Sequence, residues 1–333
     1  MVEPLDAGGA RRFSERASPS PRIVFFDMRN SFSSIATLLF LASVSCVSAR
    51  EVLLQGNGKL ARWKDGEIVW EMPWGGIHDI QQDAKGRILV QRDMHEVCAI
   101  SPEDKKVVWS YDAKTANGNA GKALEVHAFQ ALPDGHFMIA ESGVGRIIEV
   151  DAGGKLEKEI KLTVDHPAAH RDTRLARKLA NGHYLVCHEG DGMVREYDET
   201  GKVVWDYAVP LFGKQPADGH GPEAFGNQTF SSLRLENGNT LIATGNGHSV
   251  LEVTPGKEIV WKLEQKELPG IVLAWVTTLQ ILPNGNYVIG NCHAGPGQPN
   301  LIEIEPKTKK VVWKMEEYER FGNDVSNTLV VVP

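Results

Sequence analysis

Histidine, arginine and other polar side chains recur at one place in the sequence, eight residues before a turn glycine. The residues there are His78, His127, Arg174, Phe230 and Thr277, with Asn327 added by alignment of the last strand. Imidazole can act as a base or a nucleophile, and a guanidinium can bind a carboxylate or sulfate through two hydrogen bonds. If the fold brings these side chains together, His78, His127 and Arg174 are candidates for catalysis on a polar or anionic ligand.

A second set follows six residues after the same glycines. Its members are Arg92, Glu141, His188, Thr244 and Asn291, with Gln55 by alignment. We predict that both sets meet at one end of the fold, where Arg92, Glu141, His188, Thr277 and Asn291 would bind a ligand. Two alternatives remain open. The end could be a wet polar channel without a ligand, and a register error of one residue would turn each side chain to the opposite face.

Residues of the types that bind metals are also present, but their spacing matches no metal-binding motif. His127, the pair His188 and Glu189, and His293 could donate to a metal, yet no HxH, HExxH or DxDxDG pattern occurs. His166 and His170, in VDHPAAHRD, fall in a predicted loop. We predict no metal site, and we interpret these residues as scattered surface histidines.

The elements that must position these residues are short strands. Residues 182–207 read GHYLVCHEGDGMVREYDETGKVVWDY, which is three runs of β-forming residues separated by two polar turns. Residues 173–179 alternate as a strand does, and Asn181-Gly182 then favours a hairpin turn. One unit is therefore four antiparallel strands, here called A to D in chain order.

This unit recurs along the chain. The glycines of the A–B turns are Gly86, Gly135, Gly182, Gly238 and Gly285, at steps of 49, 47, 56 and 47 residues. Five D strands contain a tryptophan, at Trp70, Trp109, Trp205, Trp261 and Trp313, and Lys158 takes that position in the sixth. Four strands in a period of 40–50 residues predict a β-propeller, here an all-β fold of six four-stranded blades.

The two ends of the repeat array complement each other. Residues 51–70 supply strands B, C and D with no strand A before them, and residues 327–333 (NTLVVVP) supply a strand A with nothing after it. We predict that the last strand joins the first blade, which closes the ring and removes two open sheet edges. An open sandwich is the alternative.

The N-terminal residues differ from the repeats. Residues 1–27 have no strand period, and we interpret them as a mis-called extension before a true start at Met28. Residues 28–49 combine a basic start, a short apolar run and small residues before a cleavage point after Ala49, as in a signal peptide. We therefore expect a secreted or periplasmic domain of residues 50–333. A lipoprotein anchored through Cys46 is the alternative.

The net charge limits the classes of partner that we expect, and the cysteine content indicates whether disulfides form. Of the 36 basic and 43 acidic residues, 5 and 4 lie within residues 1–49, so the formal charge changes from −7 for the whole chain to about −8 without them. We expect no nucleic-acid partner, no transmembrane segment in the mature chain, and a monomer. The remaining cysteines, Cys98, Cys187 and Cys292, fall in different blades, and we predict buried free thiols.

Loop lengths predict a functional face. The B–C turns and D-to-A crossovers lie at one end of every blade, and all long connections belong to that end. The longest is the insertion at residues 209–227.

The pattern D-x-x-G-K-x-x-W, clearest at residues 198–205, resembles the tryptophan-docking motif of pyrroloquinoline-quinone-type propellers. The resemblance covers nearly all of residues 50–333 and implies that the five tryptophans dock each blade on its neighbour. Quinoprotein dehydrogenases of that family have eight blades, a vicinal cysteine pair and acidic calcium ligands, whereas this chain has about six blades and no adjacent cysteines. We predict no cofactor, with pyrroloquinoline quinone or a divalent cation left as alternatives.

Residues 76–79 (GIHD) and 126–127 (VH) also resemble arylsulfotransferases, six-bladed propellers that use a central histidine as a sulfate carrier. That resemblance implies the catalytic candidates named above. Our leading hypothesis is a scaffold that binds a small polar ligand or a protein through its long-loop face, without catalysis. The second is a sulfuryl-transfer or hydrolytic enzyme, and the third is a quinone-dependent dehydrogenase.

Overall fold

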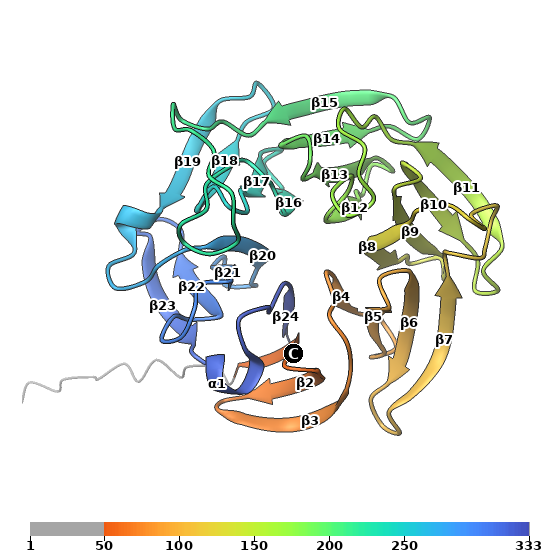
Figure 1. Cartoon of the computed structure of the whole chain (residues 1–333), viewed down its shortest axis with the longest axis horizontal. Coiled ribbons are helices and arrows are strands. Elements are labelled where there is room, and N and C mark those ends of the chain that lie inside the picture. The colour runs from red at the N-terminus through yellow and green to blue at the C-terminus, as the bar shows by residue number, and fades with distance from the viewer. Residues whose placement is uncertain (1–49, 333) are drawn as a thin grey trace, which may run out of the picture. The chain divides into compact units, whose positions relative to one another are not determined.

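In the computed structural model, which describes residues 50–332, six four-stranded antiparallel sheets are arranged in a ring (Figure 1). The β-propeller fold and its six blades are as predicted. The first three blades, from inner to outer strand, are β24 (Thr328–Val331), β1 (Glu51–Gly56), β2 (Lys59–Lys64) and β3 (Glu67–Pro73); β4 (Ile80–Gln82), β5 (Ile88–Arg92), β6 (Glu96–Ser101) and β7 (Lys106–Asp112); and β8 (Glu125–Ala131), β9 (Phe137–Ser142), β10 (Arg146–Val150) and β11 (Leu156–Lys161).

The other three blades have the same strand order. They are β12 (Ala176–Lys178), β13 (Tyr184–His188), β14 (Met193–Tyr197) and β15 (Val203–Ala208); β16 (Ser231–Arg234), β17 (Thr240–Ala243), β18 (Ser249–Val253) and β19 (Ile259–Glu264); and β20 (Trp275–Ile281), β21 (Tyr287–Cys292), β22 (Leu301–Glu305) and β23 (Lys310–Met315). Two crossovers contain one-turn helices, η1 (Gln265–Glu267) and α1 (Tyr318–Phe321). None of the helices within residues 50–332 is long and apolar enough to cross a bilayer.

The hydrophobic core lies between neighbouring blades. Strands β5, β9 and β13 are almost continuously buried, because both of their faces pack on a neighbouring sheet. The outer strands β3 and β11 instead alternate between less and more exposed residues, as strands with one solvated face do. The six blades are therefore held mainly by side chains that interdigitate across the seams.

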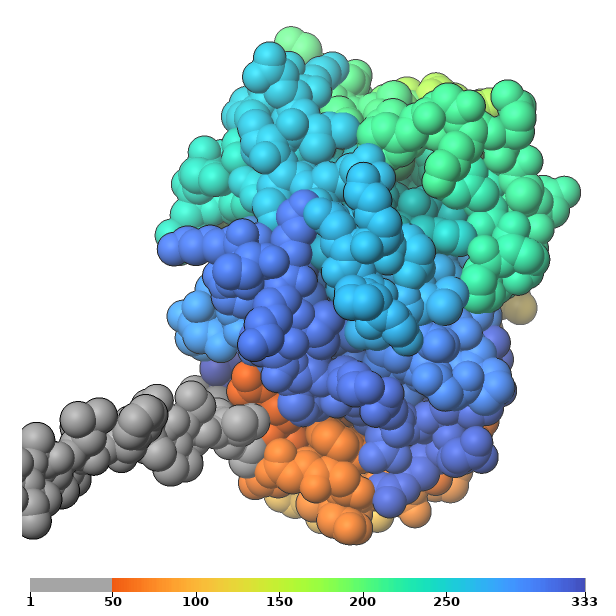
Figure 2. Space-filling view, turned by 90° about the vertical axis from the view of Figure 1, so that its left-hand side faces the viewer, coloured from red at the N-terminus to blue at the C-terminus, as the bar shows by residue number. Residues whose placement is uncertain are grey.

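The C-terminal strand closes the ring, as predicted. β24 pairs antiparallel with β1, with Val331 opposite Glu51 and Thr328 opposite Leu54. The Arg50 guanidinium adds a two-oxygen contact to Glu303 of the last blade, with Nη2 at 2.7 and 3.0 Å from the carboxylate oxygens. In Figure 2 the N-terminal strands (orange) and the C-terminal residues (blue) share one continuous surface.

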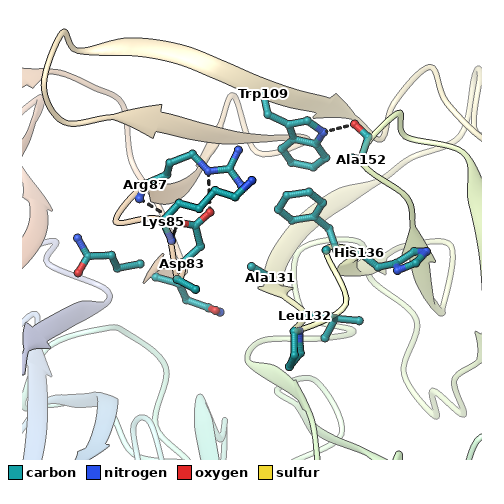
Figure 3. Close-up of a pocket in the computed structure, with 14 residues that line it drawn as sticks. Asp83, Lys85, Arg87, Trp109, Ala131, Leu132, His136 and Ala152 are labelled. Atoms are coloured by element: carbon teal, nitrogen blue, oxygen red, sulfur yellow. Dashed lines mark hydrogen bonds and ion pairs between the residues drawn. The ribbon is translucent and has the colours of Figure 1, made fainter.

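Four of the repeated tryptophans donate an indole hydrogen bond to the next blade, at its C–D turn. Trp70, Trp109, Trp205 and Trp261 donate to the carbonyl oxygens of Pro102, Ala152, Pro255 and Pro306, over 2.8–3.0 Å. Trp109 also stacks on Phe137, with ring centroids 3.8 Å apart (Figure 3). Where tryptophan is absent, Lys158 reaches the next C–D turn through an ion pair with Glu199. Trp313 packs against Trp63, with centroids 6.1 Å apart.

A bulge in the outer strand of each blade explains why an exposed valine recurs there in five blades. In every blade the C–D register shifts by one residue beside the docking position, so the preceding residue has no partner across the ladder. That residue is Glu157 in the third blade and a valine, 45–56 % exposed, in the other five: Val69, Val108, Val204, Val260 and Val312. These exposed valine side chains therefore contribute little to the core.

One buried histidine joins a crossover to its blade. His188, at the end of β13, is fully buried, with Nδ1 2.6 Å from the Asp172 carbonyl and Nε2 2.8 Å from the Tyr197 hydroxyl. Burial, followed by the charge of Arg195, lowers its pKa to about 4. The folded protein therefore holds this imidazole neutral at neutral pH.

The closure of the ring can be tested by truncation. Removing residues 327–333 takes away the only strand that pairs with the inner edge of β1 among the described residues, so we expect thermal unfolding, followed by circular dichroism, to lose its sharp cooperative transition. Removing residues 332–333 alone is the control and should leave the transition unchanged. An unchanged sharp transition in the longer truncation would contradict closure by β24.

The buried histidine predicts acid sensitivity. Between pH 6.5 and 4 the unfolded chain protonates His188 and the folded chain does not, so the free energy of unfolding falls as the pH is lowered, by about 3 kcal/mol from this group. We expect His188→Asn to flatten the pH dependence in this range, whatever its effect at pH 7. His136→Asn, at a partly exposed turn position, is the control. Equal slopes in the wild type and in His188→Asn would refute the assignment.

Candidate functional site

The end of the ring that carries the long connections contains a cavity of about 300 Å³. Its walls come from the start of the inner strands and from several crossovers, including the insertion at residues 209–227. Four of the six residues predicted at the mouth of strand A line it, namely His78, Arg174, Phe230 and Thr277.

The other two residues of that set lie directly behind the wall. His127 is fully buried, with its ring centroid 4.5 Å from that of His78. Asn327 donates from Nδ2 to the His78 carbonyl oxygen over 3.2 Å. The structure therefore brings the strand-A set together around one mouth.

Bulges in two inner strands direct these side chains. In β8, Val126 pairs with Glu141 and Ala128 with Ala140, so His127 is the extra residue of a bulge. In β20, Thr277 and Thr278 together oppose Gly290. A Cβ at Gly290 would lie 2.6 Å from Thr277 Oγ1 and 2.7 Å from the Thr278 nitrogen, so this bulge requires glycine.

The ring nitrogens of His127 contact both hydrogen-bond acceptors and a donor. Its Nδ1 is 2.9 Å from the Thr173 carbonyl oxygen and 3.1 Å from Arg174 Nη1, and its Nε2 is 2.7 Å from Glu125 Oε2. Glu125 Oε2 is also 2.8 Å from His170 Nδ1. Burial lowers the pKa of His127 to about 4, while the hydrogen bond from His127 lowers that of Glu125 to about 2.

The protonation of His78 follows from its neighbour Gln91. The Gln91 Oε1 accepts the backbone N–H groups of His78 and Asp79, over 2.8 and 3.1 Å. Its amide nitrogen must then face His78 Nδ1, at 3.3 Å, which makes Nδ1 the acceptor and places the imidazole proton on Nε2. Burial, then the nearby His127 and Arg174, lower the His78 pKa, so the ring is a neutral donor.

Two further polar groups of the wall remain available to a ligand. Arg174 is anchored by an ion pair from Nε to Glu189 and lies over the Phe230 ring, and its Nη2 has no hydrogen-bond partner within residues 50–332. Thr277 is 1 % exposed, and its hydroxyl has no partner in the described part of the chain. An unpartnered buried hydroxyl is costly unless something binds it.

The lining of the cavity also contains aromatic rings. Trp275, at the start of β20, stacks against the exposed His220 of the insertion, with centroids 5.2 Å apart. His293, from the β21–β22 loop, lies 5.3 Å from His220 and contacts Asp324. Asp218 of the insertion is an acidic group in the same lining.

The strand-B set does not line this cavity. Arg92 is exposed and pairs with Glu96, Glu141 is buried against Arg146, and His188 lies between the Asp172 carbonyl and the Tyr197 hydroxyl. The side chains of Thr244 and Asn291 hold neighbouring loops through Ser249 and Ala274, and Gln55 Nε2 lies 3.4 Å from the Trp74 carbonyl oxygen. Strand B is one strand farther from the axis, about 4.8 Å, so the crossovers cover its end.

Several residues of the site were not among the sequence-based candidates. Gln91, Glu125 and Trp275 received no role, and His170 was interpreted as a surface histidine. His170 is indeed 56 % exposed, but it also contacts Glu125. The sequence could have indicated Glu125, because it lies two residues before His127 on the same strand.

A second cavity, of about 500 Å³, lies at the opposite end, in the seam between the second and third blades (Figure 3). Two pairs of its polar groups contact each other: Arg87 with Asp83, and the Trp109 indole with the Ala152 carbonyl.

The cysteines do not match the quinoprotein pattern. Cys98, Cys187 and Cys292 are free and buried in three different blades, as predicted for free thiols. Burial raises the pKa of Cys98 and of Cys187 to about 12, which keeps both thiols protonated. The described residues thus lack the vicinal pair of quinoprotein dehydrogenases.

Comparison with known proteins supports the fold independently. A crystal structure of a protein of unknown function from Bacteroides caccae is similar, with a TM-score of 0.70 and 24 % identity over 86 % of this chain and all of that one. An inactive virginiamycin B lyase from Staphylococcus aureus has a TM-score of 0.52 and 10 % identity over 82 % of this chain and 86 % of that one. The WD40 propeller domain of Doa1 has a TM-score of 0.52 and 14 % identity over 78 % and 76 %.

Identities this low show that the fold is shared, but they give no evidence of a shared activity. No curated protein sequence matches the chain. The model of the PQQ_2 family, described as outer membrane protein assembly factor BamB, matches residues 55–315. With its six blades, its repeated docking tryptophans and this match over most of its length, the chain belongs to the PQQ_2 family of β-propellers.

Proposed function

We propose that this propeller is a binding scaffold whose mouth cavity, on the long-loop face, takes a small anionic ligand that carries a planar group. The observation that carries the proposal is that hydrogen-bond donors and aromatic rings line the same cavity of about 300 Å³. This volume lies at the small end of the range for ligand pockets.

The donors of the lining support an anionic group. The donors are the Nε2–H of His78, the free Nη2 of Arg174, the Thr277 hydroxyl and the exposed Arg171 guanidinium. Because Glu189 is already paired with Arg174, the remaining carboxylate at the cavity is the exposed Asp218. A carboxylate or sulfate would satisfy several of these donors at once.

The aromatic rings of the lining support the planar group. The Trp275 ring and the His220 ring that stacks on it could pack against an aromatic ligand, and Phe230, under Arg174, belongs to the same cluster as Trp275. His220 belongs to the insertion, so the longest crossover would contribute directly to ligand binding at this mouth. Pyrroloquinoline quinone, a planar tricarboxylate, falls in the same chemical class and belongs among the compounds to test.

The enzyme hypothesis has less support. A histidine that carries sulfate or accepts a proton needs a lone pair directed at its substrate. On His78, Gln91 holds the lone pair at Nδ1, and His127 is fully buried behind the wall. Both residues are better suited to hydrogen-bond donation and support than to covalent catalysis.

A protein partner is the other occupant that this face could take. The family model bears the name of an assembly factor, and the long loops offer a broad surface. The cavity favours the small ligand, because the unpartnered Thr277 hydroxyl is buried where a flat protein surface could not reach it.

We also propose export of the domain. Residues 28–49, with their signal-like sequence, lie outside the described residues. We expect mass spectrometry of the exported protein to find Arg50 as its first residue, whereas a lipidated Cys46 at the N-terminus would contradict cleavage after Ala49.

The unpartnered hydroxyl gives a direct test of the cavity. Thr277→Val removes a buried group that has no partner and keeps the branched shape, so the ligand-free protein should be unchanged or more stable. The same change should weaken ligand binding about tenfold, since a bound anion loses one donor. Thermal denaturation and isothermal titration calorimetry measure the two effects.

The adjacent Thr278→Val is the matched control, because the Thr278 hydroxyl is hydrogen-bonded to Asn327 over 3.0 Å and its loss should destabilise the protein. The ligands to compare are 4-nitrophenyl sulfate, an aryl carboxylate, pyrroloquinoline quinone and a neutral aryl ether. An aryl anion at about 100 times its Kd should add roughly 2.7 kcal/mol of stability, and the ether should add none. If no compound shifts the melting temperature, a protein-binding scaffold is the better interpretation.

A further inference from the structure

Three side chains beside the mouth cavity offer converging metal-ligand atoms. Nε2 of His127, Nδ1 of His170 and Oε2 of Glu125 all lie within 4.8 Å of one another. Both imidazole nitrogens point at the same carboxylate oxygen, over 2.7 and 2.8 Å. Imidazole and carboxylate together are a ligand set that suits zinc and similar transition metals.

The contacts around His127 allow two arrangements of a neutral ring, and one of them leaves room for a cation. In this arrangement Nδ1 carries the proton and donates it to the Thr173 carbonyl, which can only accept, over 2.9 Å. The lone pair of Nε2 then faces the Glu125 carboxylate at 2.7 Å, which is repulsive unless a cation lies between them.

We propose that Glu125, His127 and His170 bind a divalent transition-metal ion of the zinc type, with an open coordination position at the mouth cavity. The Thr173 carbonyl would act as the outer partner that orients His127, as is usual for metal-bound imidazoles. Three protein ligands leave a position for water or for an oxygen of a bound anion. His170 lines the cavity, which places that position beside the proposed ligand site.

The geometry requires only a small adjustment. Bonds of about 2.0–2.2 Å place the donor atoms of a tetrahedral site roughly 3.3 Å apart, so each imidazole nitrogen would move about half an ångström away from the Glu125 oxygen. His170 is 56 % exposed and comes from the β11–β12 crossover, where such a movement meets little resistance.

One contact favours the opposite arrangement. Arg174 Nη1 lies 3.1 Å from His127 Nδ1 and would donate to it if the proton were on Nε2. His127 would then be hydrogen-bonded to Glu125, with no metal between them. The two arrangements differ in one measurable respect, which is stoichiometric metal binding.

The experiment titrates the purified, untagged protein, stripped with a chelator, with Zn²⁺ by calorimetry and with Co²⁺ by visible absorption. We expect one ion per chain and, for Co²⁺, the d–d bands of an ordered site. His170→Gln should weaken binding at least about 100-fold, since even outer-shell partners of a metal are worth about 10–100-fold. Its exposed position makes misfolding of this variant easy to exclude by circular dichroism.

His166→Gln is the matched control, because His166 lies four residues away in the same crossover and pairs with Asp191 instead. It should bind metal as the wild type does. Equal affinity in wild type and His170→Gln, or no binding of either ion, would overturn the proposal. This inference extends the proposed function, but the titration contains no organic anion. Aryl-anion binding by the chelated protein would therefore survive a negative result here, and metal binding would survive the failure of the ligand screen.

Discussion

A buried ion pair across the central channel fixes the inner strands on which the site depends. Asp79 is fully buried and receives two 2.8 Å hydrogen bonds from Arg177 of β12, in the fourth blade. The same carboxylate accepts the backbone N–H of Phe129 in the third blade and the amide of Asn327 at the junction with the first. Such a pair adds little net stability compared with apolar packing, but it specifies the position of four blades.

This constraint acts directly on the mouth cavity. His78 precedes Asp79, and Gln91 holds the backbone of both residues. The neutral donor at His78, the bulge that carries His127 and the Arg174–Glu189 pair are thus placed by the inner ring. The loops contribute other parts of the lining, through Trp275 and His220. A rigid ring with functional groups on its long connections is a common arrangement in repeat folds.

The repeat explains why the fold was predictable from the sequence. The turn glycines and the D-strand tryptophans recur, so six blades, their strand order and the closing strand follow from counting, and so does the strand-A set around the mouth. Arg92, Glu141, His188 and Asn291 were expected at the same mouth, but the crossovers cover the end of strand B and turn these side chains to other partners.

The rest of the candidate site depends on contacts that no sequence spacing encodes. Glu125 and His127 come from a bulged strand and His170 from a crossover that folds back, so the three have no motif. The protonation of His78 depends on Gln91, thirteen residues away on the next strand. Thr277 and Thr278 are neighbours of the same type, and only the structure shows that one hydroxyl is paired and the other is not.

The most direct measurement of ligand binding at the mouth is a crystal structure of the protein soaked with a brominated aryl carboxylate, recorded at the bromine absorption edge. We predict an anomalous peak in the mouth cavity beside Trp275, with the carboxylate on Arg174 and Thr277. A peak in the seam beside Trp109, or no ordered bromine at all, would contradict the proposed site (Figure 3).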